Sequence, residues 1–152
     1  MVQLKKLLYF ISLIIVIGIG FISCEKEKDD PRDQYLGTWN YSVYGAATRY
    51  LLGYVYDTDV IAQGNGTYIV SKSGKNDLII DGDVYFLNGN KLTAPNRKEN
   101  FHTGEFLVTG TSTWSGQVNN NMITINSAIT GTWSNSILSG DFSGHVVITL
   151  TR

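Results

Sequence analysis

Short runs of alternating polar and apolar residues, separated by glycine and asparagine, fill the chain from Leu36 onward. The clearest run covers residues 122–133, where the odd positions are mostly Ile or Trp and the even positions mostly Thr or Asn. Because successive side chains of a strand point to opposite faces, this pattern predicts a strand with one face in the core. No stretch in this part has a convincing apolar period of 3.6 residues, so the sequence predicts an all-β fold.

Two further C-terminal runs have the same alternation. Residues 103–115 place apolar or small side chains on their even positions, and so do residues 138–150. Asn119-Asn120-Asn121 and Asn135-Ser136 supply turn residues between the three runs. We therefore expect three long antiparallel neighbours at the C-terminal end of the chain.

The earlier segments bring the expected number of strands to about eight. They are residues 38–45, 64–71, 77–80, a hairpin at 84–94, and 49–56, where Leu51-Leu52 interrupts the alternation. Eight strands in up-and-down order can close into a single antiparallel β-barrel whose first and last strands pair. A β-sandwich of two stacked sheets is the alternative.

The first 23 residues have the pattern of an export signal peptide. Residues 7–22 carry no charge and follow two lysines, and the run is shorter than the roughly 20 apolar residues of a membrane-spanning helix. Phe21-Ile22-Ser23-Cys24 resembles a lipobox, which implies cleavage before Cys24, a diacylglycerol on its thiol and an acyl chain such as palmitate on its amino group. Two or three such chains hold a protein on a membrane permanently. An uncleaved membrane anchor is the alternative.

Residues 24–34 form the expected lipidated tether. They are highly charged and offer almost no apolar surface to bury, so we expect the tether to be solvated. The acidic cluster is similar to the export signals of surface lipoproteins in Bacteroidota. That resemblance implies a lipid-anchored protein of the outer membrane, on its periplasmic face or at the cell surface. The remaining residues, 35–152, are long enough for one domain.

Charge and residue types exclude several classes of function. The net charge is −1 and no basic cluster is present, so nucleic acid is not an expected partner. Cys24 is the only cysteine, and His102 and His145 are the only histidines, without a Ser or Cys nucleophile pattern beside them. Asp57-Thr58-Asp59 and Asp81-Gly82-Asp83 do not continue into a calcium-loop pattern. We expect no catalysis, no cofactor and no metal site.

A likeness to known barrels rests on two short motifs. Gly37-Thr38-Trp39 is similar to the Gly-x-Trp of the lipocalin and avidin-type barrels, together the calycins, in which an arginine near the last strand packs over the tryptophan. The resemblance implies that Trp39 and Arg152 form a structural pair at the closed end of the barrel. Residues 113–117, Thr-Trp-Ser-Gly-Gln, resemble avidin-type barrels, but Val146 stands where those proteins have the acidic residue that binds biotin. The whole chain looks like the lipocalin-like lipoproteins of Bacteroidota.

The resemblance implies a binding protein for a small, mainly apolar ligand. The residues expected to line its cavity are inward-facing and mostly apolar: Tyr41, Val43, Phe106, Val108, Ile125, Ile129, Trp133 and Phe142. Small inward residues such as Gly110, Ser112 and Gly131 either leave a cavity or let the sheet bend tightly. The alternative function is a surface module that binds a glycan or an envelope protein with the barrel exterior, using Tyr44, Tyr50, Tyr54 and Tyr56.

Overall fold

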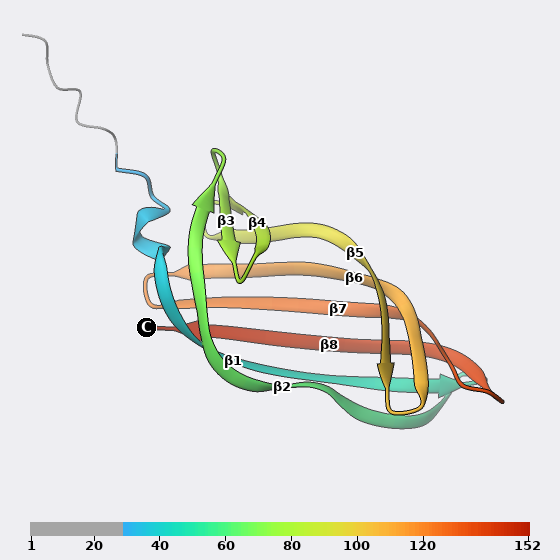
Figure 1. Ribbon diagram of the computed structural model, residues 1–152. Coiled ribbons are helices and arrows are strands. Elements are labelled where there is room, and N and C mark those ends of the chain that lie inside the picture. Colours follow the sequence, from blue (N-terminus) through green and yellow to red (C-terminus); the bar gives the residue numbers. More distant parts are fainter. Residues whose placement is uncertain (1–28) are drawn as a thin grey trace, which may run out of the picture. The chain divides into compact units, whose positions relative to one another are not determined.

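The computed structural model describes residues 29–152, so the expected signal peptide, Cys24 and the first part of the tether lie outside the described residues. Residues 32–152 form one compact unit, and within the described part of the chain no helix could span a membrane. The elements are η1 (Asp33–Tyr35), β1 (Gly37–Leu51), β2 (Tyr54–Ser73), β3 (Asp77–Ile80), β4 (Asp83–Asn88), β5 (Lys91–Thr103), β6 (Phe106–Asn119), β7 (Met122–Ser134) and β8 (Ser139–Thr151) (Figure 1).

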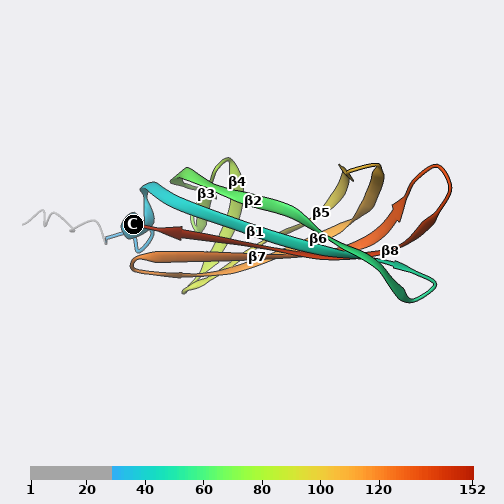
Figure 2. The ribbon, with the colours of Figure 1, turned by 90° about the horizontal axis from the view of Figure 1, so that it is seen from below.

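The eight strands form a closed antiparallel barrel in up-and-down order, which confirms the predicted fold. Each strand pairs with the next one in sequence, and β1 lies between β2 and β8 (Figure 2). The sandwich alternative is therefore wrong, because β1 and β8 close the sheet on itself. The three long C-terminal neighbours are present as β6, β7 and β8.

The predicted alternation holds in the C-terminal strands. In β7 the buried positions are the odd ones, from Ile123 to Trp133, and in β8 Phe142, Gly144 and Leu150 are buried on even positions. Leu138 was expected to point inward and does not, because it lies in the turn before β8 and is exposed. The core therefore lies on the face that the sequence pattern predicted, except at this strand end.

The first hairpin is longer than the sequence suggested. Residues 49–56 are the end of β1, a turn at Leu52-Gly53, and the start of β2, which then continues through Gly64 and Gly66. Leu52 and Gly53 both have positive φ, at 52° and 83°. The glycines of β2 do not end the strand, because the ring of Tyr41 lies over Gly66 and occupies the space a side chain would take.

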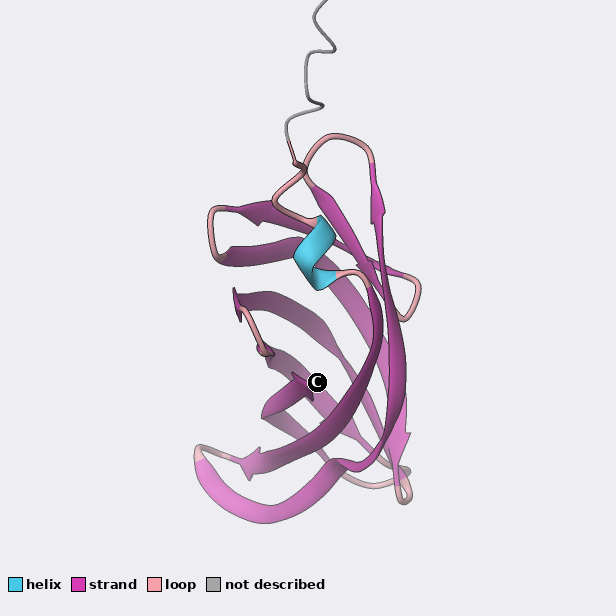
Figure 3. Ribbon diagram, turned by 90° about the vertical axis from the view of Figure 1, so that its left-hand side faces the viewer, coloured by secondary structure: helices cyan, strands magenta, loops and turns pink. Residues whose placement is uncertain are grey.

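A seam runs along the barrel between β2 and β5, because β3 and β4 are short. β2 pairs with β3 only from Val70 to Ser73, and β5 pairs with β4 only from Lys91 to Thr93. Among the described residues, positions 54–69 of β2 have ladder partners in β1 alone, and positions 94–103 of β5 have them in β6 alone. We call the stretch between positions 54–69 of β2 and positions 94–103 of β5 the seam. Figure 3 shows the barrel with η1 at the end where β1 begins.

Several inward glycines let neighbouring strands approach closely. A Cβ atom on Gly131 would lie 2.2 Å from the carbonyl oxygen of Thr109, and one on Gly110 would lie 2.4 Å from that of Thr130. Backbone atoms of β6 and β7 therefore occupy the space beside these glycines. Of the two interpretations of the small residues, tight bending is the one that applies at these two positions.

Replacing Gly131 with alanine is expected to lower the free energy of unfolding by about 1–3 kcal/mol, because the backbone must shift to admit the methyl group. Gly64→Ala is the matched control, since its Cβ would meet only Val43 at 3.8 Å, an ordinary contact. Urea denaturation of the two variants measures the difference. Equal losses would show that the ladder at Gly131 has room for a side chain.

Candidate functional site

One end of the barrel is sealed around Trp39. The side chain of Trp39 is fully buried, and its indole Nε1 donates a hydrogen bond to the carbonyl oxygen of Tyr35 at 2.8 Å. The guanidinium carbon of Arg152 lies 4.4 Å from the centre of the Trp39 ring, the arrangement expected of a structural pair. Arg152 also donates to the carbonyl oxygens of Gln34 and Leu36. The short helix η1 is thereby held across this end of the barrel.

Arg32, in the last part of the expected tether, is also part of the sealed end. Its guanidinium group donates hydrogen bonds to the carbonyl oxygens of Ser73, Gly74 and Asp77. These three carbonyls belong to the β2–β3 hairpin and its strands. The chain therefore enters the barrel at the Trp39 end, firmly docked from Arg32 onward.

The opposite end is filled by aromatic side chains. Trp133 and Phe142 are buried, and the Tyr56 ring stacks on Trp133 with 5.1 Å between the ring centres. Phe106 meets Trp133 edge-on at 5.2 Å, and Trp133 Nε1 donates to the carbonyl oxygen of Tyr50 at 3.1 Å. This end is packed rather than open.

A buried arginine cluster joins the two sides of the seam at this second end. Arg49 donates two hydrogen bonds of 2.7 Å to the carboxylate of Asp57 and one of 2.5 Å to Thr103 Oγ1. Thr103 in turn donates to Asp59 at 2.9 Å, and the Arg49 guanidinium lies 4.1 Å from the centre of the Phe106 ring. Since Asp59 lies on β2 and Thr103 on β5, side chains close the seam here in place of a backbone ladder.

Between the two filled ends lies a layer of polar side chains that point inward. We call it the middle layer, and it consists of Arg97 and Glu99 from β5, Ser112 and Trp114 from β6, and Ser127 from β7. Trp114 Nε1 donates to Ser112 Oγ at 2.7 Å, and Ser112 donates to the carboxylate of Glu99. Sequence reasoning counted Ser112 and Ser127 only as small residues and missed Glu99.

Ser127 has a buried hydroxyl without a hydrogen-bond partner among the described residues. Only 2% of the residue is exposed, and its ladder neighbours are Trp114 on β6 and Val146 on β8. An unpaired buried hydroxyl costs about 1–3 kcal/mol, so native proteins generally supply a partner for it. A bound molecule in the barrel would provide that partner.

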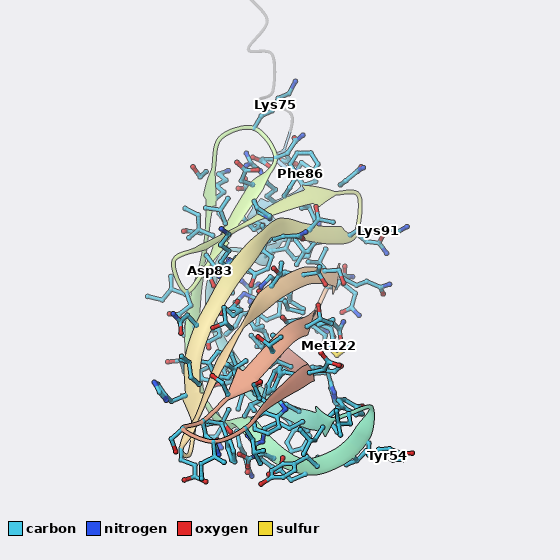
Figure 4. All side chains as sticks on the ribbon, turned by 90° about the vertical axis from the view of Figure 1, so that its right-hand side faces the viewer. Tyr54, Lys75, Asp83, Phe86, Lys91 and Met122 are labelled. Carbon is cyan, nitrogen blue, oxygen red and sulfur yellow. The ribbon has the colours of Figure 1, made fainter. Side chains whose placement is uncertain are left out.

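Solvent reaches Arg97, Glu99 and Trp114 of the middle layer although they point inward, whereas Ser112 and Ser127 are buried. Val43 and Glu99 are partly exposed. So are Tyr41 and Trp114, which pack against the Trp39 cluster, and Val146, which packs against the Trp133 cluster. At the two ends, by contrast, the inward side chains at the centre of each cluster are fully buried. Figure 4 shows the side chains along the barrel, with Lys75 near one end and Tyr54 at the other. Solvent therefore reaches the inner face of the barrel beside Glu99 and Trp114.

Aromatic and charged side chains from β1, β2, β4, β5 and β6 form two groups of contacts. The rings of Tyr41 and Tyr68 stack with 3.9 Å between their centres. Arg97 forms an ion pair with Asp83 at 2.8 Å and lies 5.1 Å from the centre of the Trp114 ring. Tyrosine and tryptophan surfaces of this kind bind flat or amphipathic ligands well.

Tyr85 lies near Asp83 and Arg97, and its buried phenol makes the stability of the protein depend on pH. Burial, followed by the negative charge of Asp83, raises the pKa of Tyr85 to about 12 from the ordinary value of 10.0. Above pH 10 the unfolded chain loses this proton while the folded protein keeps it, so stability falls as the pH rises from about 10 to 12. Tyr85→Phe removes this contribution. We expect the free energy of unfolding of the variant, measured by denaturation, to depend less on pH than that of wild type between pH 10 and 12. An equal dependence on pH in the two proteins would contradict the raised pKa of Tyr85.

The residues expected to line a cavity fall into two packed clusters. Tyr41 and Ile125 belong to the cluster around Trp39, whereas the members at the second end are Phe106, Val108, Ile129, Trp133 and Phe142. Val43 lies between them on β1 and is partly exposed. The structure therefore does not bring all eight together in one wall, and their contact with a ligand stays a prediction.

Other candidate residues are dispersed. Within residues 29–152 no three His, Cys, Asp or Glu side chains are grouped so that they could hold a metal ion. Of the four tyrosines considered for an outer surface, Tyr54, Tyr44 and Tyr56 are exposed by 79%, 51% and 44%, and Tyr50 is partly exposed. The ring of Tyr56 also stacks on Trp133. A shallow groove of about 460 Å³ lies on the barrel wall formed by β5, β6 and β7, next to Lys91, Gln117 and Asn126.

No family model, curated protein or solved structure matches the chain. The closed eight-strand antiparallel barrel is consistent with a lipocalin-like fold.

Proposed function

We propose that this protein binds a small molecule inside its barrel, at the middle layer, and carries out no catalysis. The observation that carries the proposal is the contrast in exposure along the inner face. Both ends are filled, whereas inward residues between them, such as Trp114 and Glu99, are reached by solvent. An eight-stranded barrel is just wide enough either to be filled by side chains or to hold one small ligand. The seam between β2 and β5 offers an entry that does not require either packed end to open.

The proposed ligand is amphipathic. The sequence predicted a mainly apolar ligand, but the middle layer contains a carboxylate, two hydroxyls and the partly exposed ring of Trp114. Pockets for small molecules combine apolar walls with a few precisely placed polar groups. Tyr41 and Val43 supply the apolar wall, and Glu99 and Ser127 supply the polar groups.

Native mass spectrometry of the protein purified from its own host tests the proposal. We expect wild type to retain a small molecule and Ser127→Leu, which fills the middle layer, to lose it. Ser115→Leu is the matched control, because Ser115 lies on the outer face of β6 and is exposed. A bare mass for folded wild type, or retention by Ser127→Leu, would count against an interior site.

Attachment to the cell envelope through Cys24 is the second part of the proposal. It is supported by the sequence pattern of residues 1–24. Cys24→Ala is expected to shift the protein from the membrane pellet to the soluble fraction, because the acyl chains supply the membrane affinity. Persistence of the variant in the membrane pellet would instead favour an uncleaved anchor.

Binding through the barrel exterior is the second candidate function. Tyr54 and Val55, exposed by 79% and 64%, stand at the tip of the β1–β2 hairpin and support a contact with a glycan or an envelope protein. Native mass spectrometry of the wild-type protein also distinguishes an interior binding site from an exterior one, because a protein that binds through its exterior needs no molecule inside the barrel.

A further inference from the structure

We propose that the middle layer takes a ligand with a protonated amine, whose ammonium group is bound by Glu99 and Ser127. This inference rests on the proposed interior site and names its ligand class. It follows from three features of the described residues: the hydrogen-bond donors that are already used, the local charge, and the aromatic surfaces beside the two binding groups.

Two donors of the middle layer are engaged with protein acceptors. The indole N–H of Trp114 is donated to Ser112, and the hydroxyl proton of Ser112 is donated to Glu99. Because the indole N–H is a donor only, it fixes Ser112 as acceptor from Trp114 and donor to Glu99. On Glu99 and Ser127, the second carboxylate oxygen and the unpartnered hydroxyl remain for a ligand. The carboxylate oxygen only accepts a hydrogen bond, and the Ser127 hydroxyl can accept one as well as donate one, so a single donating group of a ligand can bind both.

The local charge favours a cationic donor. Arg97 forms an ion pair with Asp83 at 2.8 Å, and among the described residues no cationic side chain lies within 4.0 Å of the Glu99 carboxylate. Glu99, Asp83 and Arg97 together therefore carry one net negative charge on the inner face. A partly buried carboxylate is stabilised by a paired cation, and hydrogen bonds between charged partners are about twice as strong as neutral ones.

Position and surroundings suit one ammonium group. Ser112 pairs with Ile129 and Trp114 pairs with Ser127, so Ser112 and Ser127 are diagonal neighbours on adjacent strands, and Glu99 accepts from Ser112. The Cα atoms of diagonal neighbours in a sheet lie about 7–8 Å apart. A ligand can therefore contact both Ser127 and the Glu99 carboxylate that accepts from Ser112. The Trp114 ring lies beside them, and the stacked rings of Tyr41 and Tyr68 offer a further surface for the ligand's apolar body.

Three probes of similar size and different charge test this inference: phenethylamine, 2-phenylethanol and phenylacetate. Isothermal titration calorimetry of the purified full chain is expected to show binding of phenethylamine at least tenfold tighter than binding of the other two. Glu99→Gln is expected to weaken phenethylamine binding at least tenfold and Ser127→Ala about fivefold, in line with the strength of hydrogen bonds to charged groups. Glu105→Gln is the matched control, because Glu105 is an exposed carboxylate in the turn between β5 and β6.

The outcomes separate this inference from the proposed function. Equal binding of 2-phenylethanol or phenylacetate, or an unchanged affinity in a folded Glu99→Gln variant, would overturn the amine while leaving an interior site intact. Absence of phenethylamine binding would also overturn it, and a molecule retained in native mass spectrometry would then show that the interior site binds something else. A bare mass together with no probe binding would remove both proposals. Circular dichroism of each variant verifies that it is folded.

Discussion

Trp39→Ala is expected to lower the free energy of unfolding by about 3–5 kcal/mol, the usual cost of removing a large buried aromatic side chain. Trp39 is fully buried among residues from several strands, donates to the carbonyl oxygen of Tyr35 and lies under Arg152. The substitution therefore leaves a cavity and also removes the hydrogen bond that joins β1 to η1. Urea denaturation followed by circular dichroism measures the loss.

Two further variants separate packing from the polar contacts of Trp39. Trp39→Phe keeps most of the ring volume but loses the hydrogen bond to Tyr35, so we expect an intermediate loss. Arg152→Ala removes the cation over the ring, worth about 0.5–2 kcal/mol. A loss below about 1 kcal/mol for Trp39→Ala would show that this end of the barrel does not depend on the tryptophan.

Arg49→Ala is expected to destabilise the protein by about 3 kcal/mol. The guanidinium group is buried, and its removal leaves Asp57 and Thr103 without their common donor and Asp59 without its ion-pair partner. Breaking a buried ion pair costs about 3–5 kcal/mol, and the partial exposure of Asp57 places this case at the lower limit. Thermal and urea denaturation measure the effect.

Lys72→Ala is the matched control for Arg49, because Lys72 forms a more exposed ion pair with Asp33. Such surface pairs contribute about 0–1 kcal/mol, so the control is expected to change stability little. The double variant Arg49→Met with Asp57→Leu replaces the pair by apolar groups and should recover much of the loss. If Arg49→Ala is as stable as Lys72→Ala, side chains do not hold the seam closed at this end.

The barrel and its C-terminal strands could be predicted from sequence because they depend on a local pattern. Alternation in β6, β7 and β8 assigns each residue to a face, and a slip of one residue would turn the whole apolar face outward. The seam could not be predicted in this way. It arises from the lengths of β3 and β4 and from where their ladders to β2 and β5 stop, which depends on tertiary packing.

The middle layer was only partly visible in the sequence. The alternation predicted correctly that Ser112 and Ser127 point inward. It could not predict which hydrogen bonds their hydroxyl groups make, because these depend on residues of other strands. Arg49 lies on an odd, inward-facing position of β1, as Trp39 does, so the alternation could have predicted that its side chain points inward. Glu99 was missed because the expected hairpin ended at residue 94, whereas β5 continues to Thr103 after a bulge between Ala94 and Arg97 that changes its parity.

Acrylamide quenching of tryptophan fluorescence tests most directly whether the interior is open to small molecules between its two filled ends. Trp39 and Trp133 are buried, with 0% and 1% exposed, whereas Trp114 points inward and is partly exposed. We predict that one part of the fluorescence is readily quenched and that Trp114→Phe removes this part alone. Quenching of Trp114 no greater than that of Trp39 and Trp133 would show a filled interior and would contradict the account.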